Sequence, residues 1–113
     1  MTSGDTGQSC RVDVWLWRAR FLKTRALAAA FVEKGAVRLT HAGRQVRLDK
    51  PSRSVHVGDE LVFALSGRLH ALRVEACGER RGPAEKARAL YTVLAFNSRY
   101  YRQLSAAYAR PQA

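Results

Sequence analysis

The chain contains few of the residues that build disulfide-rich or metal-binding proteins. Among its 113 residues there are two cysteines, Cys10 and Cys77, and three histidines, His41, His56 and His70. The cysteines are far apart and have no C-x-x-C spacing, and the histidines are scattered, so the sequence predicts no metal site. Two distant thiols in a chain without an evident export signal are more often reduced cysteines than a disulfide, which favours a cytoplasmic location.

Long apolar segments are missing as well. The longest apolar run covers residues 26–32, which is much shorter than the roughly 18 residues that a membrane-spanning helix needs. Residues 1–9 are small and polar, and they lack the basic start and apolar centre of a secretory signal. We therefore expect no membrane segment, and we interpret residues 1–10 as a disordered lead-in.

The groups that usually perform catalysis are sparse and dispersed. Asp13, Asp49 and Asp59 are well separated, serine and histidine show no paired arrangement, and there is no glycine-rich phosphate-binding loop. The sequence therefore predicts a protein that is not an enzyme and that needs no cofactor. For Asp13, at the start of a predicted helix, we expect a favourable interaction with the helix dipole or with a nearby arginine.

Basic residues, by contrast, are abundant. Twenty lysines and arginines against nine acidic residues give a net charge of +11 and a pI near 10.8. The basic excess is eight charges in residues 11–53 and four in residues 54–113, whereas residues 1–10 carry one aspartate. This balance indicates a polyanionic partner, either nucleic acid or an anionic membrane surface, of which the membrane is the weaker option because no apolar run is long enough to span it. The length and the 47% hydrophobic content fit one domain with a small core.

Residues 11–35 are typical of two amphipathic helices joined by a short basic turn. Apolar residues recur at helical spacing in the first helix (Val12, Trp15, Leu16, Ala19, Leu22) and in the second (Leu27, Ala28, Phe31, Val32). Trp17 lies on the other side of the first helix from Trp15, where it either packs in a second layer or presents its ring to a ligand. Thr24 is placed to cap the second helix, and Gly35 to end it.

The start of the second helix is suited to an anion. Its first backbone N–H groups have no intrahelical partners and the helix dipole is positive there, so a phosphate near Lys23, Thr24 and Arg25 would meet both. A solvated helix end is the alternative interpretation of the same residues.

Alternation of apolar and polar residues predicts a small antiparallel sheet after the helices. Residues 36–40 and 45–48 form a probable hairpin, residues 60–65 are the strongest strand candidate, and residues 69–76 pair back on them. Pro83 begins a further helix with Ala87, Leu90, Tyr91 and Leu94 on its apolar stripe, and residues 99–110 outline a last one. The expected fold class is α+β.

Several short motifs resemble a known RNA-binding domain, the one named after small-subunit ribosomal protein S-four. They are Arg11-x-Asp13-x-x-Leu16, Lys23-Thr24-Arg25-x-x-Ala28, Gly35-x-Val37, Lys50-Pro51-Ser52 and Val57-Gly58-Asp59. A narrower resemblance, over about residues 11–94, is to the bacterial heat-shock protein fifteen family. It is carried by Trp15-Leu16-Trp17, Ala19-Arg20-Phe21, residues 23–28, Glu79-Arg80-Arg81 and Ala89-Leu90-Tyr91.

The resemblance implies an alpha-L motif, in which two helices and a compact sheet bind structured RNA. It also implies association with ribosomal RNA of the large subunit, in a stress or ribosome-rescue role. The chain would then divide into an RNA-binding domain, residues 11–82, and a C-terminal helical extension, residues 83–113. We expect it to act as a monomer.

The resemblance implies RNA contact at the positions of this chain that match the motif. These positions are Arg11, Lys23, Thr24 and Arg25. Helix geometry and charge add Arg18 and Arg20, and the basic residues of the predicted hairpin and the loop after it, Arg38 and Lys50, complete the candidate set.

A helix-turn-helix DNA-binding regulator is the main alternative, because two short helices with a basic start to the second also describe that motif. Two features count against it. The exposed positions of the second helix offer few amide side chains for reading base edges, and a predicted sheet follows in place of a third helix. DNA binding is therefore a secondary prediction.

Overall fold

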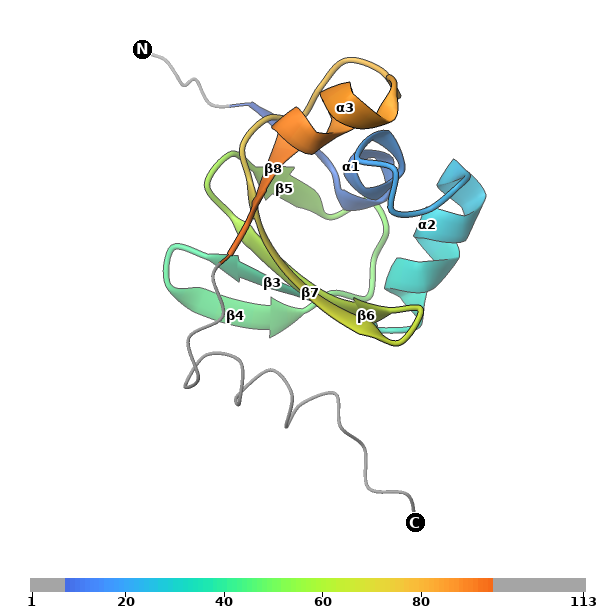
Figure 1. Cartoon of the computed structure of the whole chain (residues 1–113). Helices are drawn as coiled ribbons and strands as arrows, with labels where there is room; N and C mark the ends of the chain where they lie inside the picture. Colours follow the sequence, from blue (N-terminus) through green and yellow to red (C-terminus); the bar gives the residue numbers. More distant parts are fainter. Residues whose placement is uncertain (1–7, 95–113) are drawn as a thin grey trace.

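Two helices precede a five-stranded antiparallel sheet in this computed structural model, which describes residues 8–94 (Figure 1). The helices are α1 (Val12–Arg18) and α2 (Arg25–Glu33). In spatial order, the strands of the sheet are β4 (Arg44–Arg47), β3 (Val37–His41), β6 (Glu60–Leu65), β7 (Arg68–Val74) and β8 (Tyr91–Val93). The predicted α+β class is confirmed.

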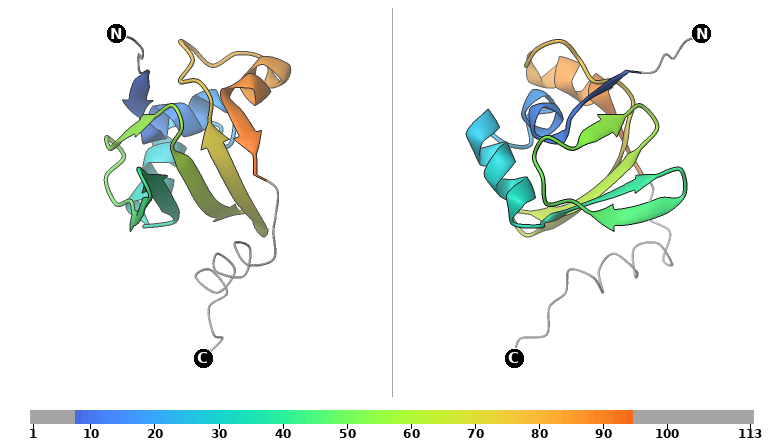
Figure 2. Two further views of the ribbon diagram at one scale, coloured as in Figure 1. Left: turned by 90° about the vertical axis from the view of Figure 1, so that its left-hand side faces the viewer. Right: turned by 180° about the vertical axis from the view of Figure 1, so that it is seen from behind.

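A second, two-stranded ladder and a short helical segment complete the fold. Strand β2 (Ser9–Arg11) pairs antiparallel with β5 (Ser54–His56), and α3 (Ala84–Ala87) runs directly into a 3₁₀ turn, η1 (Arg88–Leu90). Figure 2 shows α1 lying beside both α2 and the β2–β5 ladder, with α3 above it. No helix among residues 8–94 is long and apolar enough to cross a membrane.

The hairpin of β3 and β4 has the turn that its sequence requires. Ala42 and Gly43 both have positive φ, +51° and +82°, as the two central residues of a tight hairpin turn do when the strands keep their right-handed twist. Val37 and Leu39 of β3 face inward and are buried, which places the predicted hairpin on the core. The predicted strand over 60–65 is confirmed as β6, at the centre of the sheet.

The core is built by α1 and α2 against one face of the sheet. Its largest fully buried side chains are Trp15, Phe63, Leu16, Leu39, Leu48, Leu61 and Leu72. Trp15 is 0% exposed, and its indole Nε1 donates a 2.9 Å hydrogen bond to the Ala76 carbonyl, so the polar end of the ring is satisfied inside the core. Phe21 stacks on Trp15 and meets Phe63 edge-on, which joins the helices to the sheet.

The first helix ends earlier than its apolar pattern predicts. It stops at Arg18, with Ala19 as its C-cap, because Arg20 takes a left-handed conformation (φ +69°). The Phe21 N–H then donates to the Leu16 carbonyl and the Arg20 N–H to the Trp17 carbonyl, both at 3.0 Å. This bond pair is the Schellman pattern, in which the left-handed position is usually glycine.

The second helix matches its predicted ends and differs on one face. Thr24 caps it and Gly35, with φ +78°, follows its C-cap, as predicted. Ala28 and Val32 are fully buried, but Leu27 is 51% exposed, so the prediction that Leu27 faces the core was wrong. Leu27 belongs to the first turn of α2, whose start projects beyond the sheet in Figure 1.

Two segments differ from the sequence prediction because distant strands pair with them. Ser9 and Cys10, expected in a disordered lead-in, belong to β2 and pair with His56 and Val55. The helix expected from Pro83 through Leu94 ends at Leu90, and Tyr91–Val93 extends the sheet at the β7 edge. Residues 91–93 therefore belong to the main sheet, and the last predicted helix, 99–110, lies outside the described residues.

The two cysteines, remote in sequence, are neighbours in the fold. Both are free, Cys77 is buried, and Cys10 is half-buried on β2. Burial raises the pKa of the Cys10 thiol well above its ordinary value, and a hydrogen bond with Cys77 adds to the rise. These thiols therefore pack as small hydrophobic groups.

Candidate nucleic-acid interface

The start of α2 has the features that an anion-binding helix end requires. Thr24 is extended, and its Oγ1 accepts a 3.0 Å hydrogen bond from the Leu27 N–H, which satisfies one of the helix's first donors. The N–H groups of Arg25 and Ala26 come before that bond in the same turn. The first turn contains no acidic residue, so the positive end of the dipole has no internal counter-charge there.

Arg25 is held at this helix end by an aromatic ring. Its guanidinium carbon lies 5.8 Å from the centroid of the Trp17 ring, within the range of a cation–π contact. Trp17 is half-buried and packs against the main core, so the ring is a fixed platform and Arg25 remains exposed above it. Lys23, also exposed, lies two residues earlier in the turn. We call Lys23, Thr24, Arg25 and Trp17 the α2 start.

Three other arginines are used to attach the loop 77–82 to the end of α1. Arg18 Nη1 donates to the carbonyls of Gly78 (2.8 Å) and Cys77 (3.3 Å). Arg81 Nε donates to the Trp17 carbonyl at 3.0 Å, and Arg20 Nη1 donates to the Gly82 carbonyl at 3.0 Å. We call Arg18, Arg20 and Arg81 the loop clamp.

Among the candidate residues, Arg18 is the one whose surroundings best fit a structural role inside the protein. It is half-buried, and its Nε is buried without a hydrogen-bond partner among the described residues. A guanidinium has only donors, and two of its bonds already go to carbonyl oxygens. The prediction that Arg18 contacts RNA is not supported by this position, and we leave Arg18 out of the interface proposed below. Arg20 also makes an internal bond but remains exposed.

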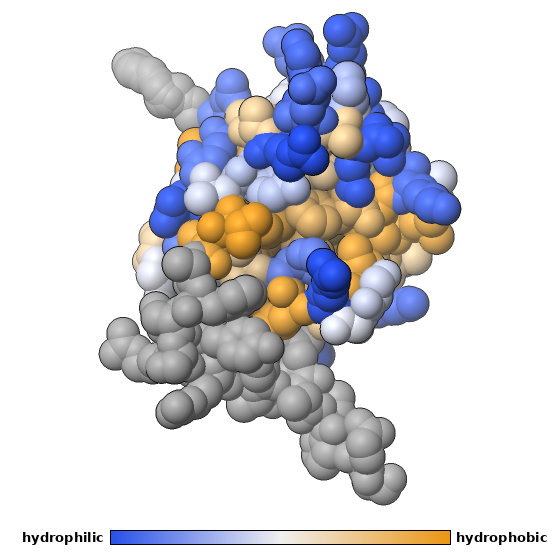
Figure 3. Space-filling model, in the orientation of Figure 1, coloured by the Kyte–Doolittle hydropathy of each residue, from blue (hydrophilic) through white to orange (hydrophobic). Residues whose placement is uncertain are grey.

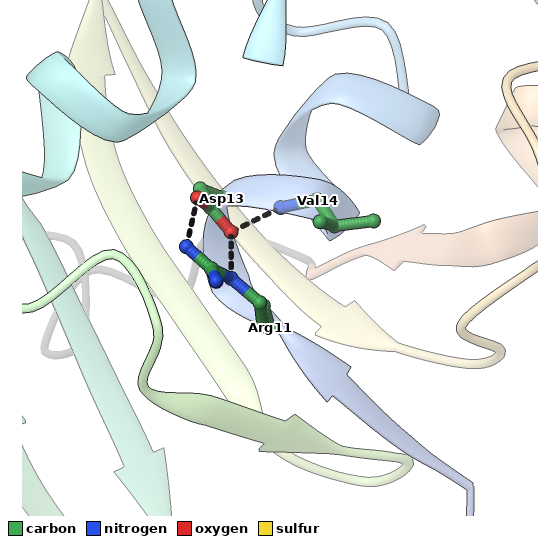
Figure 4. Close-up of polar contacts among 3 residues, drawn as sticks. All are labelled: Arg11, Asp13 and Val14. Atoms are coloured by element: carbon green, nitrogen blue, oxygen red, sulfur yellow. Dashed lines mark hydrogen bonds and ion pairs between the residues drawn. The ribbon is translucent and has the colours of Figure 1, made fainter. Parts of the chain in front are cut away.

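Arg11 is paired with Asp13, as Figure 4 shows. Arg11 Nε and Nη2 donate to the two carboxylate oxygens of Asp13 at 3.0 and 2.9 Å, and the Val14 N–H donates to Oδ1 at 2.7 Å. The Asp13 side chain is 5% exposed and that of Arg11 is 52% exposed. The hydrogen bonds with Asp13 raise the pKa of Arg11 further. Asp13 therefore pairs with an arginine, as predicted, and neutralises the Arg11 charge.

The hairpin carries a second group of cations. Arg38 of β3 lies opposite Arg47 of β4, and all four residues of β4 are exposed. The Arg47 side chain lies beside Gly35, just after the end of α2. A Cβ atom added at Gly35 would lie 3.2 Å from Arg47 Nε.

We call the basic residues of this region, Arg38, Arg44, Arg47 and Lys50, the hairpin group. Lys50 is exposed in the loop after β4. Sequence reasoning selected Arg38 and Lys50 but missed Arg44 and Arg47. The alternation of the β4 segment, which puts Arg47 on the face opposite Val46, was the available indication for Arg47, and no pattern singled out Arg44.

The α2 start and Arg47 of the hairpin group lie at opposite ends of one helix. Nine residues at about 1.5 Å each make α2 roughly 13 Å long. Figure 3 shows hydrophilic side chains gathered along the upper and right-hand edges of the molecule, over α3 and the join of α1 and α2, with a hydrophobic band below them. The exposed cations of the α2 start and the hairpin group come from the turn before α2, from α2 itself, from the β3–β4 hairpin and from the loop after it.

The fold and this surface define a small, basic α+β domain in which the first turn of α2 contains no acidic residue. No family model matches the chain. A solved structure, described as trimeric heat shock protein 15 of Vibrio cholerae, is 30% identical, and the alignment covers 93% of this chain and 98% of that one with a TM-score of 0.65. The chain belongs to the heat shock protein 15 family.

Curated relatives agree with this assignment. Heat shock protein 15 of Escherichia coli K12 is 40% identical over 81 residues, which are 72% of this chain and 57% of the relative. The homologue from Haemophilus influenzae is 35% identical over 81 residues, which are 72% of this chain and 58% of the relative. The aligned part is therefore less than two thirds of each relative. The family resemblance seen in the sequence is confirmed, and the S-four-type domain stays a prediction.

Proposed function

We propose that this chain binds structured RNA through the α2 start, with the hairpin group as a second contact. The observation that carries the proposal is Arg25, held 5.8 Å above the Trp17 ring at a helix start that contains no acidic residue. Phosphate oxygens accept hydrogen bonds from both a guanidinium and free backbone N–H groups, so one phosphate can be bound by both at this point. The net charge of +11 supplies the long-range attraction.

We propose further that α1, α2 and the strands after them act as an alpha-L motif, and that the RNA is ribosomal RNA of the large subunit. Membership of the heat shock protein 15 family supports a role under stress, and ribosome rescue is the form of that role we propose. Structured RNA is recognised mainly through its shape, its phosphates and its 2′-hydroxyls. A surface of arginine and lysine from several elements is suited to that mode.

A helix-turn-helix DNA-binding function is less well supported. The helix that would read the major groove, α2, contains only alanine, leucine, phenylalanine, valine, one arginine and one glutamate. Base-edge recognition depends on side chains such as asparagine, glutamine and arginine, and α2 offers one of these, Arg25. The strand β3 also follows α2 after three residues.

The expected monomer is at odds with the trimer described for the Vibrio cholerae protein. We propose that the RNA-binding unit is a single chain, whose α2 start is complete without a partner. Analytical ultracentrifugation with and without RNA tests this: a trimer in both conditions would overturn the monomer.

Sedimentation of a cell lysate through a sucrose gradient tests the proposed partner. We expect the protein to travel with large ribosomal subunits and to leave them when the salt concentration is raised. Binding of the purified protein to a structured ribosomal RNA fragment and to duplex DNA of equal length gives the matched comparison. A protein that stays at the top of the gradient and prefers the DNA would contradict the proposal.

A further inference from the structure

Two histidines and an aspartate from three separate segments meet on the side of the molecule away from α2. They are His41 at the end of β3, His56 at the end of β5, and Asp59 in the turn before β6. His41 Nδ1 lies 2.5 Å from Asp59 Oδ1, and His56 Nδ1 lies 3.5 Å from Asp59 Oδ2. The two imidazole rings are 5.1 Å apart. The histidines that looked scattered in the sequence are therefore neighbours.

Asp59 is a rigid anchor for this cluster. Its side chain is only 4% exposed, and its Oδ2 accepts a 2.9 Å hydrogen bond from the His56 backbone N–H. Its own N–H donates to the His56 carbonyl at 2.9 Å, and its carbonyl accepts from the Val74 N–H at 2.8 Å. A buried carboxylate needs hydrogen-bond donors or a positive charge beside it, and among the described residues the side chains paired with Asp59 are the imidazoles of His41 and His56.

We propose that His41, His56 and Asp59 form a binding site for a divalent transition-metal ion, with Zn²⁺ as the ion that suits them best. Two imidazole nitrogens and one carboxylate oxygen are the donors of zinc sites that keep one coordination position open. Magnesium and calcium prefer oxygen donors throughout, which this set does not offer. The proposal does not depend on RNA binding.

The geometry is close to what zinc requires. One ligand atom from each residue lies within 4.8 Å of the others. Bonds of about 2.0–2.1 Å in a tetrahedron place ligand atoms about 3.3 Å apart, so His41 and Asp59 must move apart and the widest pair of ligand atoms must close by up to about 1.5 Å. The side chains of His41 and His56 are 54% and 47% exposed, so they can rotate while Asp59 stays fixed.

The site would join two separate parts of the fold. His41 lies beside the β3–β4 turn and His56 lies on the two-stranded ladder, so a shared ion would tie the hairpin to β5. In Figure 1 the β3–β4 turn and β5 lie on the left and α2 on the right. Arg44 lies opposite His41 in the hairpin, and its positive charge weakens cation binding, so we expect micromolar and not tighter affinity.

Calorimetric titration of the full chain, without an affinity tag, with Zn²⁺ tests the proposal. We expect one ion per chain, and we expect His41→Ala and His56→Ala each to lower the affinity by about tenfold or more, since loss of a ligand costs at least as much as loss of a supporting residue. A Cys10→Ser/Cys77→Ser double variant controls for binding by thiols and should bind as the parent does. Both histidines are exposed, so their variants should fold, which the unfolding temperature without metal verifies.

Nuclear magnetic resonance gives a site-specific readout. Added Zn²⁺ should shift the ring signals of His41 and His56 and leave those of His70, on β7, unchanged. The proposal is overturned if the parent chain does not bind Zn²⁺, if both histidine variants bind it as the parent does, or if the cysteine variant loses it. In the first two cases the cluster is only a set of hydrogen bonds around a buried aspartate.

Discussion

The loop clamp and the α2 start carry the same kind of charge within a few residues of each other and differ in what surrounds it. Arg18, Arg20 and Arg81 donate to carbonyl oxygens of the loop 77–82 and of α1. Arg25 lies over the Trp17 ring, and its guanidinium makes no hydrogen bond or ion pair with residues 8–94. A count of positive charges would not separate these two groups.

The polarity of helix ends explains part of the difference. The C-terminal end of α1 presents the Trp17 carbonyl, to which Arg81 donates, and the loop 77–82 packed beside it presents the carbonyls that Arg18 and Arg20 use, because a guanidinium has only donors. The N-terminal end of α2 presents N–H groups, with which a guanidinium cannot bond, so Arg25 keeps its donors for a ligand. Arginines beside the start of a helix are therefore better candidates for anion binding than arginines beside its end.

The largest expected effect is on the scaffold that both groups share. Trp15→Ala should lower the free energy of unfolding by about 3–5 kcal/mol, because the side chain is fully buried and its removal leaves a cavity and an unpaired Ala76 carbonyl. That is a large part of the stability of a small domain. Urea unfolding followed by circular dichroism measures it. A loss below about 1 kcal/mol would mean that the core can close around the site.

Removal of a clamp residue should affect stability more than binding. Arg18→Ala should cost about 1.5–3 kcal/mol of unfolding free energy, the range for hydrogen bonds made by a charged group. The same urea experiment measures the cost. RNA affinity, corrected for the folded fraction, should stay close to that of the parent. If Arg18→Ala folds normally but binds RNA poorly, Arg18 belongs to the interface.

Arg25→Ala should show the opposite pattern. RNA affinity should fall by about tenfold, equal to roughly 1.4 kcal/mol, which is the worth of about one charge-assisted hydrogen bond. Stability should change by no more than about 0.5–1 kcal/mol, the value of an exposed cation–π contact. Arg68→Ala, an exposed arginine at the start of β7, is the control of equal charge. Equal losses of affinity in both variants would remove the α2 start as a site.

The smallest effect concerns the backbone of the clamp. Arg20 occupies the left-handed position after α1, where a residue with a Cβ is strained by about 1–2 kcal/mol and glycine is not. Both Arg20→Gly and Arg20→Ala lose the bond to the Gly82 carbonyl. The glycine variant should therefore be the more stable of the two, by about 1 kcal/mol. Thermal unfolding of the pair gives this difference, and equal midpoints would show that the conformation is not strained.

Local features explain what the sequence could predict. The Thr24 cap, the glycine after α2 and the β3–β4 hairpin depend on residues within a few positions of one another, so their patterns are visible in one segment. Lys23, Thr24 and Arg25 of the α2 start belong to the same class, because they are consecutive residues, whereas the contact of Arg25 with Trp17 joins two helices. Trp15 could also be placed in the core from its spacing alone.

Contacts between distant segments explain what it could not predict. Residues 91–93 continue a predicted helix in the sequence, but in the structure they pair with the free edge of β7. These residues are aromatic or β-branched, and such residues favour strands. The internal role of Arg18 depends on carbonyls 59 and 60 residues later, which no local pattern reveals. The meeting of His41, His56 and Asp59 likewise depends on the way the strands are arranged.

The salt dependence of RNA binding tests the central claim most directly, because it counts phosphate contacts. If the parent contacts about five phosphates, log K should fall against log salt with a slope of about −3.5 to −4.5. Arg25→Ala should make that slope shallower by about 0.7–0.9, and Arg68→Ala, with the same loss of charge, should leave it unchanged. Identical slopes in the parent and Arg25→Ala, or a slope near zero in the parent, would contradict the account.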